Sequence, residues 1–594
     1  MNRYSAPVRD MKFALYDVIQ ADKLYARLGM EHAQRDLLDA VMDEAARFNE
    51  TVLAPLNAAG DEHGCRFDKD TGAVTTPPGF REAYAQFVDG GWAGLTAPEA
   101  MGGQDLPESF GAALKEMIDA ACLSWGNYPL LSHGATEALK HHGEDWQKEV
   151  FLKPIIAGRW TGTMCLTEPH CGSDLGLLKT RAEPRGDGTH AITGTKIFIT
   201  GGEHDFTDNI VHLVLARLPD APPGTRGISL FLVPKFLVEK DGSLGRRNDV
   251  FCASIEHKLG IHASPTCTMI YGDGFARDGE PGAVGWLVGE ENRGLACMFT
   301  MMNNARLAVG IQGVAVAETA FQKALAYARE RRQGRASGHK GEGMSPIAEH
   351  PDVARDLLTM KSLTRMARAI AYACAHAIDM AGAASGDAAR DWSERANLLT
   401  PVAKAFSTDV GVDVASIGVQ VHGGMGYIEE TGAAALLRDA RIAPIYEGTN
   451  GIQAIDLVMR KLPLSGGAQV AGYIAELRGD VEAIRASNLA GFGRSADRIA
   501  AALDDLEAAT AYLAEQTKAG NVDTALAGAT PYLRLFGLAA GGAYLARAAV
   551  SGGEDERIAL CRFAAENLLT ETPALRDRVT EGAESLAAAA RQVA

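Results

Sequence analysis

Residues 445–453 read Ile-Tyr-Glu-Gly-Thr-Asn-Gly-Ile-Gln and place one carboxylate, Glu447, between an apolar–aromatic pair and a glycine. Gly448 lets the backbone turn sharply or approach a ligand closely, and the pattern predicts a helix from Ile452 to Lys461 directly afterwards. A carboxylate on such a loop is well placed to act as a base, because apolar neighbours raise its pKa. The alternative is a glutamate that complements the dipole of the helix, and the stretch by itself favours that alternative.

The composition limits the classes of protein to which the chain can belong. Its 594 residues, 47% of them apolar, predict several domains with buried cores. A net charge of −17 disfavours binding to nucleic acid or to an anionic membrane. The nine cysteines are scattered, which indicates a reducing compartment, no disulfide framework and no metal site. The sequence has neither the apolar core of a signal peptide nor an apolar run of about 18 residues, so we expect a cytoplasmic protein without a membrane span.

The hydrophobic periodicity changes along the chain and divides it into segments. Leu37, Leu38, Val41 and Ala45 recur at helical spacing, whereas short β-prone runs separated by turn residues follow Trp160. The predicted domains are an N-terminal arm (1–35, extended from Tyr4 with an amphipathic tail), an N-terminal helical domain (36–159), a middle β domain (160–290), a helical bundle (291–462) and a C-terminal helical extension (468–594). The predicted strands are 196–200, 210–218, 228–233, 266–271 and 284–288, and further predicted helices are 295–330, 351–384 and 392–421.

Four more segments occur in a fixed order before the first one. They are TEPHCGSD at 167–174, TGTKIFITGG at 193–202, ARERRQG at 328–334 and VQVHGGMGY at 419–427. Together with IYEGTNGIQ, they resemble the acyl-CoA dehydrogenases, flavoenzymes that desaturate acyl-CoA thioesters, over about residues 36–460. The resemblance implies an α+β multidomain fold made of an N-terminal helical domain, a middle β domain and a helical bundle, with a C-terminal helical extension like that of the larger members.

A glycine-rich segment, Gly491 to Ala496, mimics a dinucleotide-binding fingerprint, but it joins two predicted helices and no strand precedes it. We interpret it as a turn, so an FAD cofactor must be held by other residues. The cofactor-binding residues implied by the resemblance are Met164, Leu166, Thr167, Gly172, Ser173, Phe198, Thr200, Arg331, Gln333, Gln420, Gly423, Gly424 and Thr449. Phe198 stands where the family usually has tryptophan, which keeps an aromatic wall but loses the indole N–H donor. Taken alone, these segments favour ordinary turns, a core strand and a solvated charge run.

The resemblance also implies a shared site and a substrate side. Arg331, Gln333 and Gln420 would serve the cofactor of the neighbouring subunit, so a homodimer is expected. The residues implied to contact substrate are Ser173, Asn303, Arg306, Tyr446 and Gly448. Asn303 stands where the family usually has aspartate. Some members carry their base at the position of Ala305, and because alanine cannot be a base, Glu447 is the candidate.

The implied reaction is FAD-dependent α,β-dehydrogenation of a short acyl-CoA to the trans-2-enoyl-CoA, with an electron-transfer flavoprotein as the acceptor. The arm, the FTMMNNARLAVGIQG helix and the extension are most similar to members whose acyl group is short and contains a thioether, 3-methylmercaptopropionyl-CoA. A general short- or medium-chain acyl-CoA dehydrogenase is the alternative. A nucleic-acid-associated relative with a similar core is a remote alternative, because it requires a basic surface and the net charge is −17.

Overall fold

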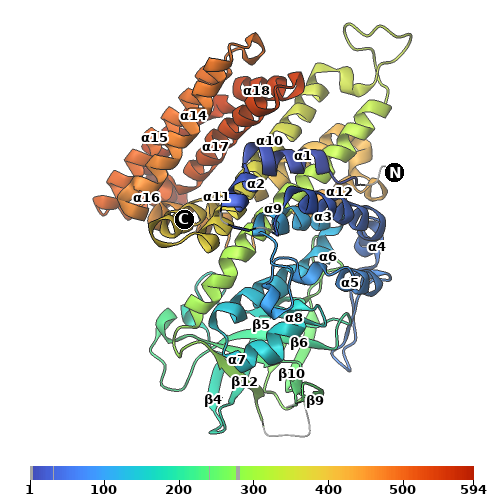
Figure 1. The fold of residues 1–594 in the computed structure, drawn as a ribbon, viewed down its shortest axis with the longest axis vertical. Coiled ribbons are helices and arrows are strands. Elements are labelled where there is room, and N and C mark those ends of the chain that lie inside the picture. Colours follow the sequence, from blue (N-terminus) through green and yellow to red (C-terminus); the bar gives the residue numbers. More distant parts are fainter. Residues whose placement is uncertain (1–3, 28, 31, 240, 276–280, 594) are drawn as a thin grey trace. The chain divides into compact units, whose positions relative to one another are not determined.

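The computed structural model describes residues 4–593, apart from 28, 31, 240 and 276–280, and leaves out the side chains of 27 and 301–303. The chain forms two compact units, which we call the helical unit (Met1–Glu50, Pro107–Ala121 and Arg306–Ala594) and the sheet unit (Thr51–Leu106 and Cys122–Ala305). Two long helices, α6 (Glu108–His142) and α9 (Gly294–Glu330), contribute residues to both units (Figure 1). The units therefore do not follow the predicted segments one to one, because residues 107–121 pack with the helical unit.

The sheet unit is built around an eight-stranded sheet in the order β10-β11-β5-β12-β7-β6-β3, with β4 paired to β5. Its pairs are antiparallel except for β3 with β6, which are parallel. Two further sheets of two strands each are β1 with β2 and β8 with β9. The strands of the unit are β1 (Arg66–Phe67), β2 (Val74–Thr75), β3 (Trp160–Cys165), β4 (Arg181–Pro184), β5 (His190–Thr200), β6 (Asn209–Ala216), β7 (Ser229–Pro234), β8 (Phe236–Val238), β9 (Leu244–Arg247), β10 (Val250–Ile255), β11 (Thr266–Tyr271) and β12 (Ala283–Val288). The helices of this unit are α4 (Leu56–His63), α5 (Phe80–Asp89), α7 (Asp145–Gln147) and α8 (Lys153–Ile156).

The five predicted strands are confirmed as β5, β6, β7, β11 and β12. Strand β3 was not predicted, because its sequence WTGTMC is buried at every position and shows no alternation of polar and apolar residues. The core of the sheet unit is a cluster of buried side chains, most of which come from the strands. Its members include Cys165, Ile192, Val214, Phe231, Val250, Met269 and Tyr271.

The helical unit contains the remaining helices. They are α1 (Val8–Phe13), α2 (Ala21–Arg27), α3 (Arg35–Phe48), α10 (Pro351–Ala383), α11 (Gly386–His422), α12 (Ala433–Ala440), α13 (Asn450–Asp456), α14 (Ala468–Ser487), α15 (Ser495–Lys518), α16 (Val522–Ala527), α17 (Ala529–Gly552), α18 (Asp555–Asn567) and α19 (Thr572–Val593). Helices α9 and α11 approach each other closely. A Cβ at Gly310 would lie 2.4 Å from the carbonyl oxygen of Ala403, and one at Gly313 would lie 2.2 Å from that of Ser407. These two positions of α9 therefore require glycine.

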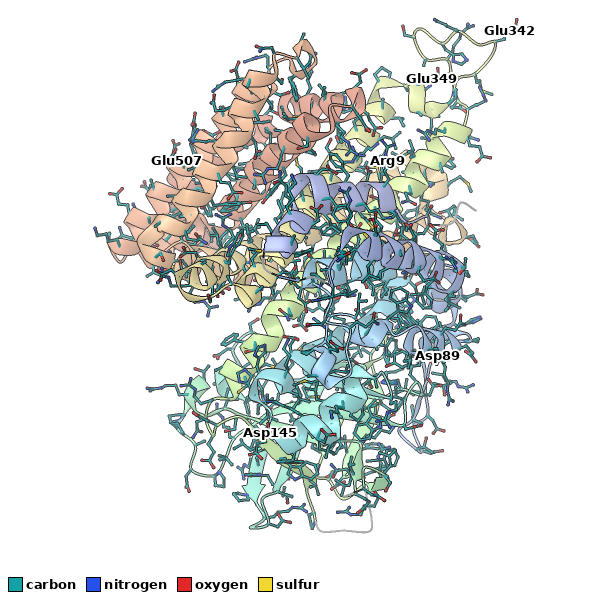
Figure 2. All side chains as sticks on the ribbon, in the orientation of Figure 1. Arg9, Asp89, Asp145, Glu342, Glu349 and Glu507 are labelled. Carbon is teal, nitrogen blue, oxygen red and sulfur yellow. The ribbon has the colours of Figure 1, made fainter. Side chains whose placement is uncertain are left out.

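The C-terminal extension packs as helix on helix, as its apolar stripes predicted. The predicted inward residues of α14 and α15 are all buried, namely Val470, Tyr473, Ile474, Leu477, Val481, Ile484, Ile499, Leu503, Leu506 and Leu513. Helix α17 packs against α10, α14, α15, α18 and α19. On the solvent side, Glu507 of α15, labelled in Figure 2, points away from the neighbouring helices. It pairs with Arg478 of α14 at 2.7 Å. The segment Gly491 to Ala496 joins α14 to α15, which agrees with its interpretation as a turn.

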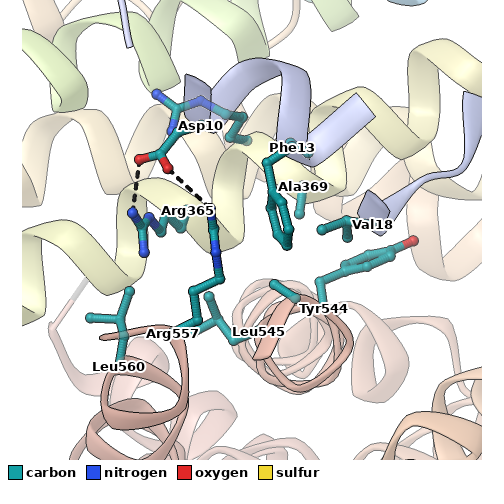
Figure 3. Close-up of a pocket in the computed structure, with 12 residues that line it drawn as sticks. Asp10, Phe13, Val18, Arg365, Ala369, Tyr544, Leu545, Arg557 and Leu560 are labelled. Atoms are coloured by element: carbon teal, nitrogen blue, oxygen red, sulfur yellow. Dashed lines mark hydrogen bonds and ion pairs between the residues drawn. The ribbon is translucent and has the colours of Figure 1, made fainter. Parts of the chain in front are cut away.

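The prediction of an extended arm was wrong for its middle part. Residues 8–13 form α1 and residues 14–18 continue as a π-helical turn, because Met11, Leu15 and Val18 recur at helical spacing and become buried. Asp10 of α1 pairs with Arg365 of α10 at 2.7 Å. Arg557 of α18 lies over the ring of Phe13, the last residue of α1 (Figure 3). The arm thus joins α10 to the C-terminal extension.

Within the described part of the chain, no helix is long and apolar enough to cross a membrane.

Candidate active site

The segment with Glu447 forms a tight loop that directly precedes α13. Glu447 has a φ of 54°, in the left-handed region that few side-chain-bearing residues adopt, and Gly448 follows with a φ of 83°. Thr449 is the N-cap of α13, and its hydroxyl accepts a hydrogen bond from Ile452 N at 3.2 Å. Glu447 therefore lies outside the first turn of the helix, so the loop, and not a helix dipole, determines its position.

The environment of the Glu447 carboxyl favours a base. Burial raises its pKa above the ordinary value, and the charges of Arg306 and Lys404 offset part of this effect. Burial lowers the pKa of Lys404 to about 7, although the nearby Glu447 and Asp409 oppose this shift. A raised pKa makes this carboxylate a stronger proton acceptor than an exposed glutamate, and the two nearby cations favour its ionised form.

The predicted substrate-side residues Tyr446, Gly448 and Arg306 lie in the helical unit with Glu447. The Tyr446 hydroxyl donates to Gln312 of α9, which fixes the residue before the candidate base. Arg306 is buried and pairs with Asp456 of α13 at 3.3 Å. Its Nε has no hydrogen-bond partner among the described residues. Ala305 is buried, and the side chain of Asn303 lies outside the described residues.

In the sheet unit, the predicted cofactor residues lie on β3, on the segment that follows it and on β5. Met164 is buried in β3, Leu166 and Thr167 are half-buried, and Gly172 and Ser173 are exposed. Two more predicted cofactor residues, Phe198 and Thr200, come from β5. The Phe198 side chain remains 58% exposed, with a φ of 59°. The exposed Phe198 ring and the hydroxyl groups of Thr167 and Ser173 suit the ring of a flavin, and phenylalanine supplies an aromatic wall without a donor.

Glu168 gives the same segment its shape. Its carboxylate accepts hydrogen bonds from Lys179 N at 2.7 Å, from Thr180 N at 3.0 Å and from Lys196 Nζ at 2.9 Å. Ligand atoms of Glu168, His170 and Cys171 lie within 4.8 Å of one another. Lys196 neutralises the Glu168 carboxylate, and the internal donors occupy its oxygens. We therefore assign it a structural role in the loop, and we assign no metal to this group.

The remaining cofactor candidates lie in the helical unit, next in sequence to residues that line a groove. Arg331, Gln333, Gln420, Gly423 and Gly424 are exposed. The groove, of about 1100 Å³, is lined by neighbours of these residues in sequence, including Tyr327, Glu330, His422 and Met425. A Cβ at Gly423 or Gly424 would meet no atom within 4 Å, so there is open space above this backbone. The arginine fork and an uncovered glycine pair suit a pyrophosphate.

One residue near the candidate base, Lys404, had no signal in the sequence. Lys404 looks like any lysine of a long helix until α11 is folded, when it becomes fully buried. Its Nζ donates to Asn450 Oδ1 at 2.8 Å. The helical period placed Lys404 on the predicted helix 392–421, but a single sequence does not show which residue of another segment a buried charge meets.

Comparisons with known proteins cover nearly the whole chain. Family models match at residues 36–159 (acyl-CoA dehydrogenase, N-terminal domain), 163–273 (middle domain), 292–462 (C-terminal domain) and 469–590 (acetyl-CoA dehydrogenase C-terminal like). The chain is 45% identical to 3-methylmercaptopropionyl-CoA dehydrogenase of Ruegeria pomeroyi, over 98% of this chain and 99% of that protein. It is 35% identical to a butyryl-CoA dehydrogenase of Syntrophomonas wolfei, over 80% and 78% of the two chains. The fold is similar to that of Caenorhabditis elegans ACDH-11 in complex with C11-CoA, with a TM-score of 0.74, 18% identity and 94% of each chain covered.

Proposed function

The chain belongs to the acyl-CoA dehydrogenase family, and we propose that it oxidises a short acyl-CoA thioester to the trans-2-enoyl-CoA with FAD as cofactor and Glu447 as base. The observation that carries the assignment of the base is the loop at 445–453. It holds one carboxylate, with a raised pKa and two cations nearby, in front of α13. The position that carries the base in some relatives is Ala305 here, which has no group that accepts a proton.

The proposed reaction removes two hydrogen atoms from adjacent carbons of the acyl chain. The Glu447 carboxylate takes the α-proton, and its backbone N–H helps to polarise the thioester carbonyl, which carries negative charge as the proton leaves. FAD, when bound, accepts the hydride that leaves the β-carbon. The remaining electron pair forms the α,β double bond, so the product is conjugated with the thioester.

Two sets of residues support the proposed FAD site. The first is the sheet-unit set, in which Thr167, Ser173 and the exposed Phe198 ring suit the flavin ring. The second is the groove set, in which Arg331 and the open glycine pair suit the pyrophosphate of a neighbouring subunit. We propose a homodimer as the functional unit and an electron-transfer flavoprotein as the acceptor that reoxidises the flavin.

For the substrate, we propose 3-methylmercaptopropionyl-CoA, the thioester named for the Ruegeria pomeroyi relative, which matches this chain over nearly its whole length. The butyryl-CoA dehydrogenase of Syntrophomonas wolfei supports the general short-chain alternative. We expect kcat/KM for 3-methylmercaptopropionyl-CoA to be at least comparable with that for butyryl-CoA. A preference of about tenfold or more for longer straight chains, which corresponds to about 1.4 kcal/mol, would favour the alternative.

The variant Glu447→Gln tests the assignment of the base. Glutamine keeps the size and most of the hydrogen bonding of glutamate but does not accept the proton. We expect the variant to retain FAD and to bind acyl-CoA, while the rate of flavin reduction falls by about 10²–10⁴-fold, the usual contribution of a general base. Anaerobic stopped-flow bleaching of the oxidised flavin isolates this step from electron transfer to the partner.

The matched control is Glu507→Gln, the same chemical change on the solvent side of α15, which we expect to leave the rate unchanged. If Glu447→Gln reduces its flavin within about threefold of the wild-type rate, against the expected range for a general base, the base lies elsewhere.

A further inference from the structure

The loop that carries Glu447 is closed and strained. Asn450 N donates to the carbonyl oxygen of Pro444 at 3.0 Å and closes the loop. Gln453 Nε2 reaches back to the carbonyl oxygens of Glu447 at 3.3 Å and Gly448 at 3.4 Å. A glutamate in the left-handed region persists only where the surrounding contacts over-determine its backbone, so the contacts that hold this loop bear directly on the position of its carboxylate.

The side chain of Asn450 connects the loop to α11 through hydrogen bonds at both ends of its amide. Its Oδ1 accepts from Lys404 Nζ at 2.8 Å. Its Nδ2 donates to Asp409 Oδ1 at 2.7 Å and to the carbonyl oxygen of Ala405 at 3.1 Å. The hydroxyl of Thr408 lies 3.0 Å from the same nitrogen. These partners hold the Asn450 amide in one orientation. We call the four α11 residues that contact it, Lys404, Ala405, Thr408 and Asp409, the α11 clamp.

Helix α11 is itself held on two sides, so the clamp has a firm support. On one side, Gly310 and Gly313 of α9 touch its backbone. On another side, a Cβ at Gly537 of α17 would lie 2.2 Å from the ring of Phe406, and Arg534 of α17 pairs with Asp413 at 3.3 Å. The C-terminal extension thus supports the helix to which the loop is fastened.

The clamp also fixes a charge close to the candidate base. The cations that act on Glu447 are Lys404 and Arg306, and Arg306 is paired with Asp456. The carboxylate of Asp409 lies on the clamp side and acts on Lys404. Because Asn450 holds both Lys404 and Asp409, it helps to fix the position from which the Lys404 charge acts on Glu447.

We propose that Asn450, held by the α11 clamp, is a positioning residue for proton abstraction. It fixes the strained loop and thereby orients the Glu447 carboxylate toward the α-carbon of the acyl-CoA. This inference rests on the proposed function, because it takes Glu447 as the base. The side-chain partners of Asn450 lie on α11, so we assign it no contact with the substrate or the reacting atoms. Its effect therefore belongs to the rate of the chemical step and leaves substrate binding nearly unchanged.

The test uses the FAD-loaded full-length protein and the variant Asn450→Ala. Alanine is compatible with the first turn of a helix but removes every contact to the clamp. We expect the limiting rate of flavin reduction to fall by about tenfold to a hundredfold, because a misplacement of about 1 Å costs up to this much. The dissociation constant for the enoyl-CoA product, followed by the flavin spectrum, should stay within about threefold. Asn450→Ser provides a second variant that is smaller and also suits the start of a helix.

The matched control is Asn397→Ala. Asn397 also lies on α11, and its Oδ1 accepts from Lys461 Nζ at 2.9 Å. This variant therefore removes a lysine–asparagine bond between α11 and the turn that follows α13, away from the loop. We expect normal flavin reduction from it. The inference is overturned if both Asn450 variants reduce flavin within about threefold of the wild type while Glu447→Gln does not. It is also overturned if rate, product binding and melting temperature fall together in the Asn450 variants and in Asn397→Ala. If Glu447→Gln is itself active, the proposed function fails first.

Discussion

At the scale of single residues, Glu447 was identified from a motif, but its properties follow from partners that are distant in sequence. The apolar neighbours in 445–453 predicted a raised pKa, and the structure gives a shift in that direction. The left-handed backbone at Glu447 was not predictable, because glycine, asparagine and aspartate are the residues usually associated with that region. Lys404 lies 43 positions before Glu447, and no local pattern connects them.

Removal of the Lys404 charge should change the pH dependence of the reaction. Burial lowers the pKa of Lys404 to about 7, so its ammonium is charged at acidic pH, and this charge lowers the pKa of Glu447. In Lys404→Met the pKa of Glu447 rises. The base is then protonated up to a higher pH, and we expect the acidic limb of the kcat/KM profile to move to higher pH.

The control for this shift is Lys461→Met. Lys461 is also a partly buried lysine with a lowered pKa, but its charged neighbours are Asp456, Arg460 and Arg306, and Glu447 is not among the groups that act on it. We therefore expect the acidic limb of the kcat/KM profile to stay in place in Lys461→Met. An unchanged limb in Lys404→Met would show that the ammonium does not influence the base.

At the scale of elements, periodicity identified the segments that have a clear polar and apolar side. The β-branched strands of the sheet unit and the stripes of α14 and α15 belong to this class. Strand β3 was missed because it is buried on both sides. The arm was misjudged because a short helix such as α1 is not stable by itself. It forms on α10 and α18, and a single sequence does not show that surface.

Asp10 should stabilise the junction between the arm and the extension in a pH-dependent way. Burial raises its pKa, but Arg365 and Arg557 outweigh this and leave the pKa below the ordinary value of 3.8. A carboxyl with a lowered pKa stabilises the fold above its unfolded pKa, and this contribution is lost as the pH falls. We therefore expect Asp10→Asn to lower the melting temperature at pH 7, with a difference from the wild type that shrinks toward pH 3.

The control for the junction is Asp43→Asn. Asp43 also pairs with a residue of the arm, Lys12 at 2.8 Å, but its side chain is 63% exposed. An exposed pair contributes about 0–1 kcal/mol, so its melting temperature should hardly change. Equal effects of the two substitutions would contradict a specific role for the partly buried ion pair.

At the scale of the whole molecule, the proposed dimer places residues of two chains in each flavin site. The fold could be predicted because five ordered motifs resemble those of the family, and the resemblance implies its succession of domains. The second chain follows only from resemblance, since Arg331 and Gln420 are exposed in the single chain. Light scattering should give a dimer, and an active monomer would contradict the shared site.

Subunit complementation provides a sharper test of sharing. Arg331→Met should weaken FAD binding, and Glu447→Gln should abolish flavin reduction. If Arg331 serves the neighbouring flavin, a mixed dimer of the two variants keeps one complete site, because the defects fall together in the other site. We expect co-expression of the two variants to restore activity, measured as flavin reduction by acyl-CoA. Without restoration, each chain would build its own site.

The glycine contacts between α9 and α11 have a consequence for the time scale of motion. Where Gly310 and Gly313 touch the backbone of α11, there is no room for water to reach the amide groups unless the two helices separate. Deuterium exchange in the middle of α11 should therefore require a large opening and proceed much more slowly than in the exposed last turns of α19. Because α11 opens so slowly, the loop at 445–453 that is fastened to it should keep its shape through many catalytic cycles.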